Sequence, residues 1–448
     1  MSETQPGSTT NSSPDPALTR RRFLALGAAG AAGAALVAAS PSVASAAVRT
    51  GAVRSGVTNI REPDAKTTLS FLSWDELKVI TPVVDLFEKQ NPSIKVELEY
   101  LPPIPAYVSG LSTRLLAGIG PDIFIYTVEN KTQLNKYNYV YDLSSQPFVK
   151  VMAANNRNFM SYNGGVWGLS VAAWAGGIYY NKALLAKVGS GPAQTWDEFL
   201  TLCGKFKAMG ITPYFGGGQP DTVVEALIGS HFKTAGLTDA AIFDGKATFA
   251  EYWGPPLALY DKLYSTGLVP ASMIGVSAQS GELLSEFANG KLAAYASGPW
   301  DSPGILADNP KLDFEMYPVP GATAASQSYW CGAPTEGWAI NAKSKNLPGA
   351  LKFLEFLASP EALKLYGSQS GQIITTTNVT TPVAPELTLC GKAARASTYY
   401  YTGISWPAPI ADALGTVANA QFELLIQGKV TPAQLEANMQ AAMKRLQA

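Results

Sequence analysis

Short β-rich runs alternate with helical segments in the first third of the chain, and this alternation is the feature that most restricts its fold. Residues 68–73 form an apolar β-rich run, residues 77–87 place apolar side chains at helical spacing, and residues 94–100 alternate apolar with polar side chains. A second helical segment and a further strand follow at 107–117 and 122–126. This order predicts a doubly wound α/β lobe in which right-handed crossover connections join parallel strands.

The length of the chain requires at least two lobes. The sequence has 448 residues, whereas a single hydrophobic core stops growing at about 250–300 residues. The formal net charge is -1, so neither a nucleic-acid footprint nor a basic membrane-binding patch is indicated. We therefore expect no nucleic-acid partner.

Metal and redox chemistry have little support in the sequence. The chain has one histidine, His231, and three cysteines without CxxC or zinc spacing. We therefore expect no metal site and no cofactor. Cys331 and Cys390 could form one disulfide, and the sequence alone does not decide whether they pair.

The N-terminus is typical of an exported protein. Four residues have the spacing of a twin-arginine export signal: Arg20, Arg21, Phe23 and Leu24. An Ala/Gly-rich apolar run follows to about Ala39, and the segment closes with the small residues 44–46. We interpret residues 1–46 as a cleaved signal peptide and residues 47–66 as a flexible leader. The apolar run is close to membrane-spanning length, so an uncleaved anchor is the alternative.

Seven segments between Thr67 and the C-terminus resemble, in the same order, family 1 of the extracellular solute-binding proteins, the sugar-binding components of ABC importers. The segments are LFEKQNPSIKVELEY, GPDIFIY, GVWGLSVAAWAGGIYYNKALLAKVG, TWDEF, FANGKLAAYASGPWD, GWAINAKSKNLPGALKFLEFLASPEAL and LIQGKVTPAQLEANMQ. The resemblance to maltose-binding proteins is closest at Gly298-Pro299-Trp300, where the aromatic ring of family members stacks on the sugar.

This resemblance implies a two-lobed clamp of the periplasmic-binding-protein type, with α/β lobes that are discontinuous in sequence. It places three hinge crossings near Ala173, Val319 and Ser359. The resulting boundaries assign residues 67–173 and 319–358 to lobe 1, and residues 174–318 and 359–448 to lobe 2. The sugar is expected in the cleft between the lobes.

The resemblance also implies individual ligand contacts. The family positions that match here are Trp74, Tyr126, Glu129, Trp174 and Trp300. A pyranose has a face of C–H groups and an edge of hydroxyls, so its receptor needs flat apolar rings and oxygen acceptors. On this ground further candidates are Asp75, Glu76, Asp301, Glu336 and Trp338. For each aromatic residue the alternative is packing in a core, and for each acid it is a solvated loop or a helix cap.

Several positions depart from the family pattern. Most relatives have a proline where Ser170 stands, a maltose-type protein has an acid in place of Trp174, and a proline is missing at Ile373-Ile374. A signal-terminating lipobox cysteine, common in Gram-positive relatives, is also missing. We therefore expect a ligand that differs from maltose.

These features together predict a monomeric, exported receptor that binds a mono- or oligosaccharide, passes it to the permease subunits of an ABC importer, and has no catalytic residues. Its location would be the periplasm or the cell surface. One alternative is the same fold with a quaternary ammonium or polyamine ligand, for which aromatic rings and acids are equally suitable. A secreted glycosidase is the other, because it also combines aromatic residues with paired carboxylates.

Export is expected to require the arginine pair. Replacing both Arg20 and Arg21 by lysine should leave the protein in the cytoplasm, because the twin-arginine pathway reads the arginines rather than positive charge alone. Cell fractionation and immunoblotting measure the distribution. Export equal to that of the unaltered chain would contradict the assignment.

Overall fold

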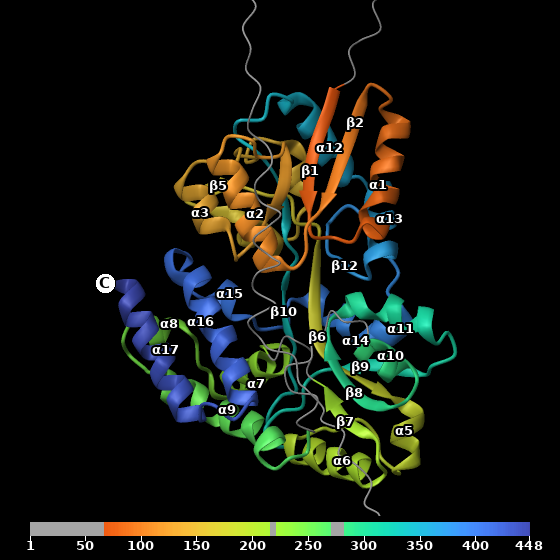
Figure 1. Cartoon of the computed structure of the whole chain (residues 1–448), viewed down its shortest axis with the longest axis vertical. Coiled ribbons are helices and arrows are strands. Elements are labelled where there is room, and N and C mark those ends of the chain that lie inside the picture. The colour runs from red at the N-terminus through yellow and green to blue at the C-terminus, as the bar shows by residue number, and fades with distance from the viewer. Residues whose placement is uncertain (1–66, 216–220, 270–281) are drawn as a thin grey trace, which may run out of the picture. The chain divides into compact units, whose positions relative to one another are not determined.

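The computed structural model describes residues 67–215, 221–269 and 282–448. The predicted signal peptide (1–46) and leader (47–66) lie outside the described residues. Two large β-sheets, a two-stranded hairpin and the surrounding helices form the described part of the chain (Figure 1). Among its helices, none combines the length and the apolar composition needed to cross a membrane.

The first sheet confirms the predicted alternation of strands and helices. Its order is β11-β3-β1-β2, and it is built from β1 (Thr67–Ser73), β2 (Ile94–Tyr100), β3 (Ile123–Tyr126) and β11 (Gly337–Ile340). β1 is parallel to both β2 and β3, whereas β11 joins β3 antiparallel. Its helices are α1 (Leu77–Gln90), α2 (Ile104–Leu116), α3 (Lys131–Lys136), α4 (Ala154–Met160), α12 (Leu347–Leu357) and α13 (Pro360–Ser370). A small hairpin joins β4 (Ser161–Tyr162) to β5 (Gly165–Val166).

The second sheet is organised around one long strand. Its members are β6 (Ala172–Asn181), β7 (Thr212–Phe215), β8 (Leu292–Ser297), β9 (Phe314–Tyr317), β10 (Cys331–Pro334) and β12 (Ile373–Ile374). β8, β9, β10 and β12 all pair antiparallel with β6, and β7 is parallel to β8.

The helices that surround the second sheet either precede β9 or follow β12 in the sequence. They are α5 (Lys182–Lys187), α6 (Trp196–Ala208), α7 (Asp221–Ala235), α8 (Ala240–Phe243), α9 (Phe249–Ser265), α10 (Glu282–Ala288), α11 (Ser302–Asp308), α14 (Thr388–Ala396), α15 (Thr402–Ser405), α16 (Ala408–Ile426) and α17 (Pro432–Gln447). Capping boxes begin α6 and α17, with Thr195 and Thr431 as the caps.

Two of the predicted hinge crossings need correction. Strand pairing places residues 319–334 with the second sheet, because β10 pairs with β6, and the chain enters the first sheet only at β11. The second crossing is therefore at Thr335-Glu336 and not near Val319. α13 packs on α1, and its residues Leu363 and Tyr366 belong to the first core.

The third crossing consequently lies after β12 rather than near Ser359, because Ile374 and Val379 pack with the first core whereas Leu387 packs in a core of the second lobe. The strand β12 itself pairs with β6. At the first crossing the buried residues change from the first core at Ala172 to the second lobe at Ala173. Sequence motifs could not locate the second and third crossings, since these depend on which partner a short strand finds.

The cysteines do not form a disulfide. Cys203, Cys331 and Cys390 are buried thiols. The Cys331 Sγ atom lies 3.8 Å from the Glu225 carboxylate, and the Cys390 thiol donates to the Ala175 carbonyl at 3.2 Å. The pairing that the sequence left open is therefore not made.

Candidate functional site

The first lobe brings three of the predicted carboxylates together. Asp75 follows β1 and Glu129 follows β3, and the carboxyl ends of parallel strands meet at the same edge of a sheet, where α/β proteins bind ligands. Glu336 lies at the second crossing, directly before β11. Asp75 and Glu129 are both close enough to act electrostatically on Glu336.

Burial and mutual repulsion change the proton affinity of these acids. Burial and, after it, the charge of Asp75 together raise the pKa of Glu336 to about 8, and a hydrogen bond from the Trp74 indole opposes the shift. Burial raises the pKa of Asp75 to about 6 and also raises the pKa of Glu129. The Asp75 Oδ2 atom is buried without a hydrogen-bond partner among the described residues. Such an acceptor is available to a hydroxyl donor of a ligand.

The second lobe contributes a group of aromatic rings. Trp174 on β6 packs edge-on against Trp300, with ring centroids 5.5 Å apart, and against Tyr401 at 5.7 Å. Trp174 is half-buried, whereas Trp300 is 37% exposed. The rings therefore keep accessible apolar surface of the kind that a sugar face can cover.

The backbone around Trp300 holds this ring in place. A Cβ atom on Gly298 would lie 2.2 Å from the Trp300 ring, so the ring lies across residue 298 and requires glycine there. The Gly298 carbonyl accepts a hydrogen bond from the Tyr179 hydroxyl at 3.0 Å. Trp300 is thus presented in a preorganised orientation.

Asp301 fixes the same turn. One of its carboxylate oxygens accepts hydrogen bonds from the Tyr295 and Ser297 hydroxyls, at 2.7 and 2.6 Å. Burial raises the pKa of Asp301. Because this oxygen is already used, the structure gives Asp301 a structural task beside its predicted contact with ligand.

Three of the predicted ligand residues lie apart from the exposed rings and the buried carboxylates described above. Tyr126 is fully buried, and its hydroxyl accepts a hydrogen bond from the Asn135 amide at 2.6 Å. Trp338 is also buried in the first core, where it packs edge-on against Tyr366. Glu76 is exposed and forms a 2.6 Å ion pair with Lys78. As ligand contacts these three residues stay predictions.

Tyr401 is a site residue that the sequence did not indicate. Its neighbours on both sides are anchored to buried carboxylates. Glu225 accepts hydrogen bonds from the backbone N–H and hydroxyl of Thr402, at 3.1 and 2.6 Å. Asp239 accepts from the Tyr400 hydroxyl at 2.8 Å. The run of three tyrosines at 399–401 was the available signal, but its spacing has no helical or strand period.

Asp412 is a second residue that was missed. It lies on α16, which packs against α3 of the first lobe. Burial and the charge of the nearby Glu129 together raise the pKa of Asp412 to about 7, and Lys131 opposes this shift. Burial lowers the pKa of Lys131, which has Glu129 and Asp412 as its neighbouring charges. The acidic group therefore includes a residue of each lobe.

Ser170, one of the departures from the family pattern, is part of a buried hydrogen-bond chain. Its hydroxyl donates to the Thr335 carbonyl at 2.6 Å and accepts from the Asn156 amide at 2.8 Å. A proline at this position could not make these bonds. Ser170 thereby links α4 to the crossing that carries Glu336.

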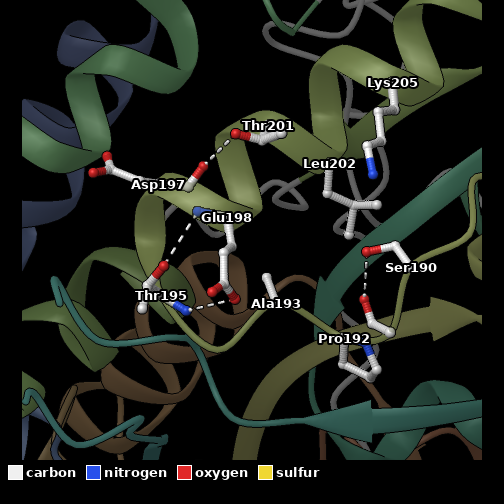
Figure 2. Close-up of a pocket in the computed structure, with 10 residues that line it drawn as sticks. Ser190, Pro192, Ala193, Thr195, Asp197, Glu198, Thr201, Leu202 and Lys205 are labelled. Atoms are coloured by element: carbon white, nitrogen blue, oxygen red, sulfur yellow. Dashed lines mark hydrogen bonds between the residues drawn. The ribbon is translucent and has the colours of Figure 1, made fainter. Parts of the chain in front are cut away.

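A cavity of about 380 Å³ lies elsewhere in the second lobe, at the start of α6 (Figure 2). None of the predicted ligand residues lines it, and two of its polar side chains serve in helix capping: the Thr195 hydroxyl accepts from the Glu198 N–H, and Glu198 accepts from the Gln194 N–H. This cavity is therefore not the candidate site. Over the described ranges, acids, histidine and cysteines form no cluster suited to a metal ion.

Comparison with known proteins gives a consistent family. The model of the family described as bacterial extracellular solute-binding protein matches residues 73–364. A multiple sugar-binding protein of Streptococcus mutans is 26% identical over 302 residues, which cover 64% of this chain and 70% of that protein. A melibiose/raffinose/stachyose-binding protein of Bacillus subtilis is 24% identical over 314 residues, 67% of this chain and 72% of that protein.

Solved structures share the fold. A family 1 extracellular solute-binding protein from Bifidobacterium longum subsp. infantis is 28% identical, with a TM-score of 0.67 over 85% of this chain and 100% of that one. The solute-binding protein RafE in complex with raffinose has a TM-score of 0.70 at 20% identity, over 85% and 100% of the two chains. These likenesses support the two-lobed clamp that the sequence predicted.

Glu336→Gln tests the proton affinity of the acidic group. The pKa of Glu336 is about 8 in the folded protein against a usual value of 4.5. The folded state therefore holds this proton more tightly than the unfolded state does, and stability falls as the pH rises from about 4.5 to 8. Glutamine cannot ionise, so we expect it to raise the free energy of unfolding by roughly 2–4 kcal/mol at pH 8.5 and by less than about 1 kcal/mol at pH 4.5.

Urea denaturation at the two pH values measures this difference. Glu97→Gln, at an exposed position of β2, is the matched control and should change stability by less than about 0.5 kcal/mol at either pH. An equal effect of Glu336→Gln at both pH values would contradict the expected burial of this carboxyl group.

Proposed function

The chain belongs to the bacterial extracellular solute-binding proteins, and we propose that it is the sugar-binding receptor of an ABC importer. It holds a mono- or oligosaccharide between its lobes and delivers it to the permease subunits. It acts outside the cytoplasm, in the periplasm or at the cell surface, as a monomer and without catalysis. The arginine motif at the N-terminus supports twin-arginine export.

The observation that carries this proposal is the presence of accessible aromatic rings together with buried carboxylates. Trp174, Trp300 and Tyr401 offer apolar surface from the second lobe. Asp75 and Glu336 offer acceptors from the first lobe and the second crossing. A pyranose needs both, because its C–H face stacks on rings and its hydroxyl edge donates to carboxylates.

The expected energies are sufficient for a tight receptor. Burying half of an indole, roughly 100 Å² at about 25 cal/mol/Å², contributes about 2–3 kcal/mol. A hydrogen bond to a carboxylate adds about 1.5–3 kcal/mol before desolvation is subtracted. Two or three such contacts therefore reach the roughly 8 kcal/mol of a micromolar site.

The named relatives favour an oligosaccharide. One is called a multiple sugar-binding protein, one a melibiose/raffinose/stachyose-binding protein, and a structural neighbour holds raffinose. The tryptophan at position 174, where a maltose-type protein has an acid, favours a ligand other than maltose. We therefore place raffinose-type oligosaccharides first among the candidate ligands.

A calorimetric screen tests the function directly. Raffinose, stachyose, melibiose, maltotriose and chito-oligosaccharides are titrated into the purified protein, with glycine betaine and spermidine as non-sugar arms. We expect micromolar or tighter binding of at least one sugar and recovery of that sugar unchanged. If only glycine betaine or spermidine binds, the ligand is a cation and not a sugar. If cleaved sugar is released, the protein is an enzyme and not a receptor.

Trp300→Ala is expected to separate sugar contact from packing. If the ring stacks on the sugar, affinity falls by about 2–3 kcal/mol, roughly 30- to 150-fold, while the Tm of the unliganded protein changes little. Trp253, which is fully buried in the second core, is the contrasting control: its replacement by alanine should cost about 3–5 kcal/mol of stability. A large loss of stability in Trp300→Ala with intact affinity would refute the assignment.

Ligand is also expected to compact the protein. A sugar that contacts both lobes binds the closed arrangement better, and this difference in affinity drives closure about the three crossings. Small-angle scattering with and without saturating raffinose should give a smaller radius of gyration for the complex. The Trp300→Ala variant at a concentration that leaves it unliganded serves as the control, and an unchanged radius for the saturated native protein would contradict closure.

A further inference from the structure

We propose that Gly371 positions Trp300 and thereby sets the strength of sugar binding at this turn. Gly371 ends α13 in the left-handed backbone region, with φ of +70°, and precedes β12. It therefore lies between a helix of the first lobe and a short strand that pairs with β6. The effect on affinity rests on the proposed function, whereas the effect on the ring does not.

Gly371 lies directly against the turn that carries the ring. A Cβ atom added to it would be 2.7 Å from the carbonyl oxygen of Pro299 and 3.5 Å from Cδ of Pro303. The first distance is shorter than a Cβ atom tolerates from a backbone oxygen, so the close approach requires glycine. Pro299 directly precedes Trp300, and Pro303 follows in the next helix, α11. The contact therefore involves the chain on both sides of the ring.

This contact connects the turn to the first lobe. Leu363 and Tyr366 anchor α13 in the first core, so the end of this helix has a fixed position. The hydrogen bonds that Tyr179 and Tyr295 donate to the turn come instead from β6 and β8 of the second lobe. The turn that carries Trp300 is thus contacted from both lobes, and Gly371 supplies a backbone contact from the first lobe.

Gly371→Ala is expected to force α13 and Pro299 apart. A displacement of about 0.5–1 Å forfeits about a quarter to a half of the contact energy of a packed group, so affinity for raffinose should fall about threefold to tenfold, less than in Trp300→Ala. Gly371→Asn adds the same Cβ atom, but asparagine tolerates the left-handed conformation. It should therefore give a similar loss of affinity with a smaller fall in Tm.

Gly210→Ala is the matched control. Gly210 has φ of +71° in the turn after α6, and an added Cβ atom would meet nothing within 4 Å. It therefore reproduces the backbone strain of Gly371→Ala without a contact. We expect a comparable fall in Tm with unchanged affinity for raffinose.

A readout without sugar follows from the geometry of the tryptophan pair. The Trp174 and Trp300 rings are 5.5 Å apart and inclined by 65°, so their near-ultraviolet circular dichroism depends on their relative orientation. Both Gly371 variants should change this signal in the unliganded protein. Gly210→Ala should not change the signal. Adding either Gly371 substitution to Trp300→Ala should also leave the signal unchanged from that of Trp300→Ala alone.

The double variant completes the test. When Trp300 is already alanine, Gly371→Ala should cause no further loss of raffinose affinity. An unchanged spectrum in both Gly371 variants, or a loss of affinity that persists without Trp300, would overturn the proposal. A changed spectrum with unchanged affinity would support the positioning role and refute the sugar contact of Trp300, so the two proposals fail by different results.

Discussion

Pairing along β6 is the constraint on which the rest of the structure depends. The first residues of this strand pair with β10 and β12, and its last residues pair with β8 and β9. The first crossing is the start of β6, and the other two lie next to strands bonded to it. Nine of its ten residues are buried, and the partly exposed one is Trp174. The strand that joins the lobes therefore also presents a ring of the candidate site.

Buried carboxylates serve two purposes in this protein, and their partners distinguish them. Asp239 accepts hydrogen bonds from Tyr400, Ser405 and Trp406, which fixes the segment that carries Tyr401. Asp75 instead keeps a buried oxygen without a partner in the described structure. A buried acid that lacks donors holds its proton more tightly, at a cost in stability if it ionises. That cost is explained if a ligand supplies the missing donors.

Much of the first lobe could be predicted from sequence because its pattern is periodic. β1, α1 and β2 follow from alternation and helical spacing. The orientation of Tyr126 could not, because all four residues of β3 are apolar and all four are buried, so no alternation marks a face. Trp174 and Trp300 were identified through family motifs rather than periodicity.

The second and third crossings, Tyr401 and Asp412 depend on long-range packing. β10 is a short run, Cys331–Pro334, without β-branched residues, so its partner strand could not be inferred locally. Tyr401 lies between two residues whose anchors, Glu225 and Asp239, are far away in sequence. Local sequence patterns do not indicate contacts between residues that are so far apart in the sequence.

The discontinuity of the lobes has a consequence for synthesis and export. Gly337 pairs with Tyr126 to complete the first sheet, and Ile373 pairs with Ala173 in the second. Neither sheet can therefore be completed until most of the polypeptide has left the ribosome, and such non-local pairing slows folding. An export pathway that translocates unfolded chains would delay the formation of both sheets until after translocation. The proposed twin-arginine route would instead allow the receptor to fold in the cytoplasm before export.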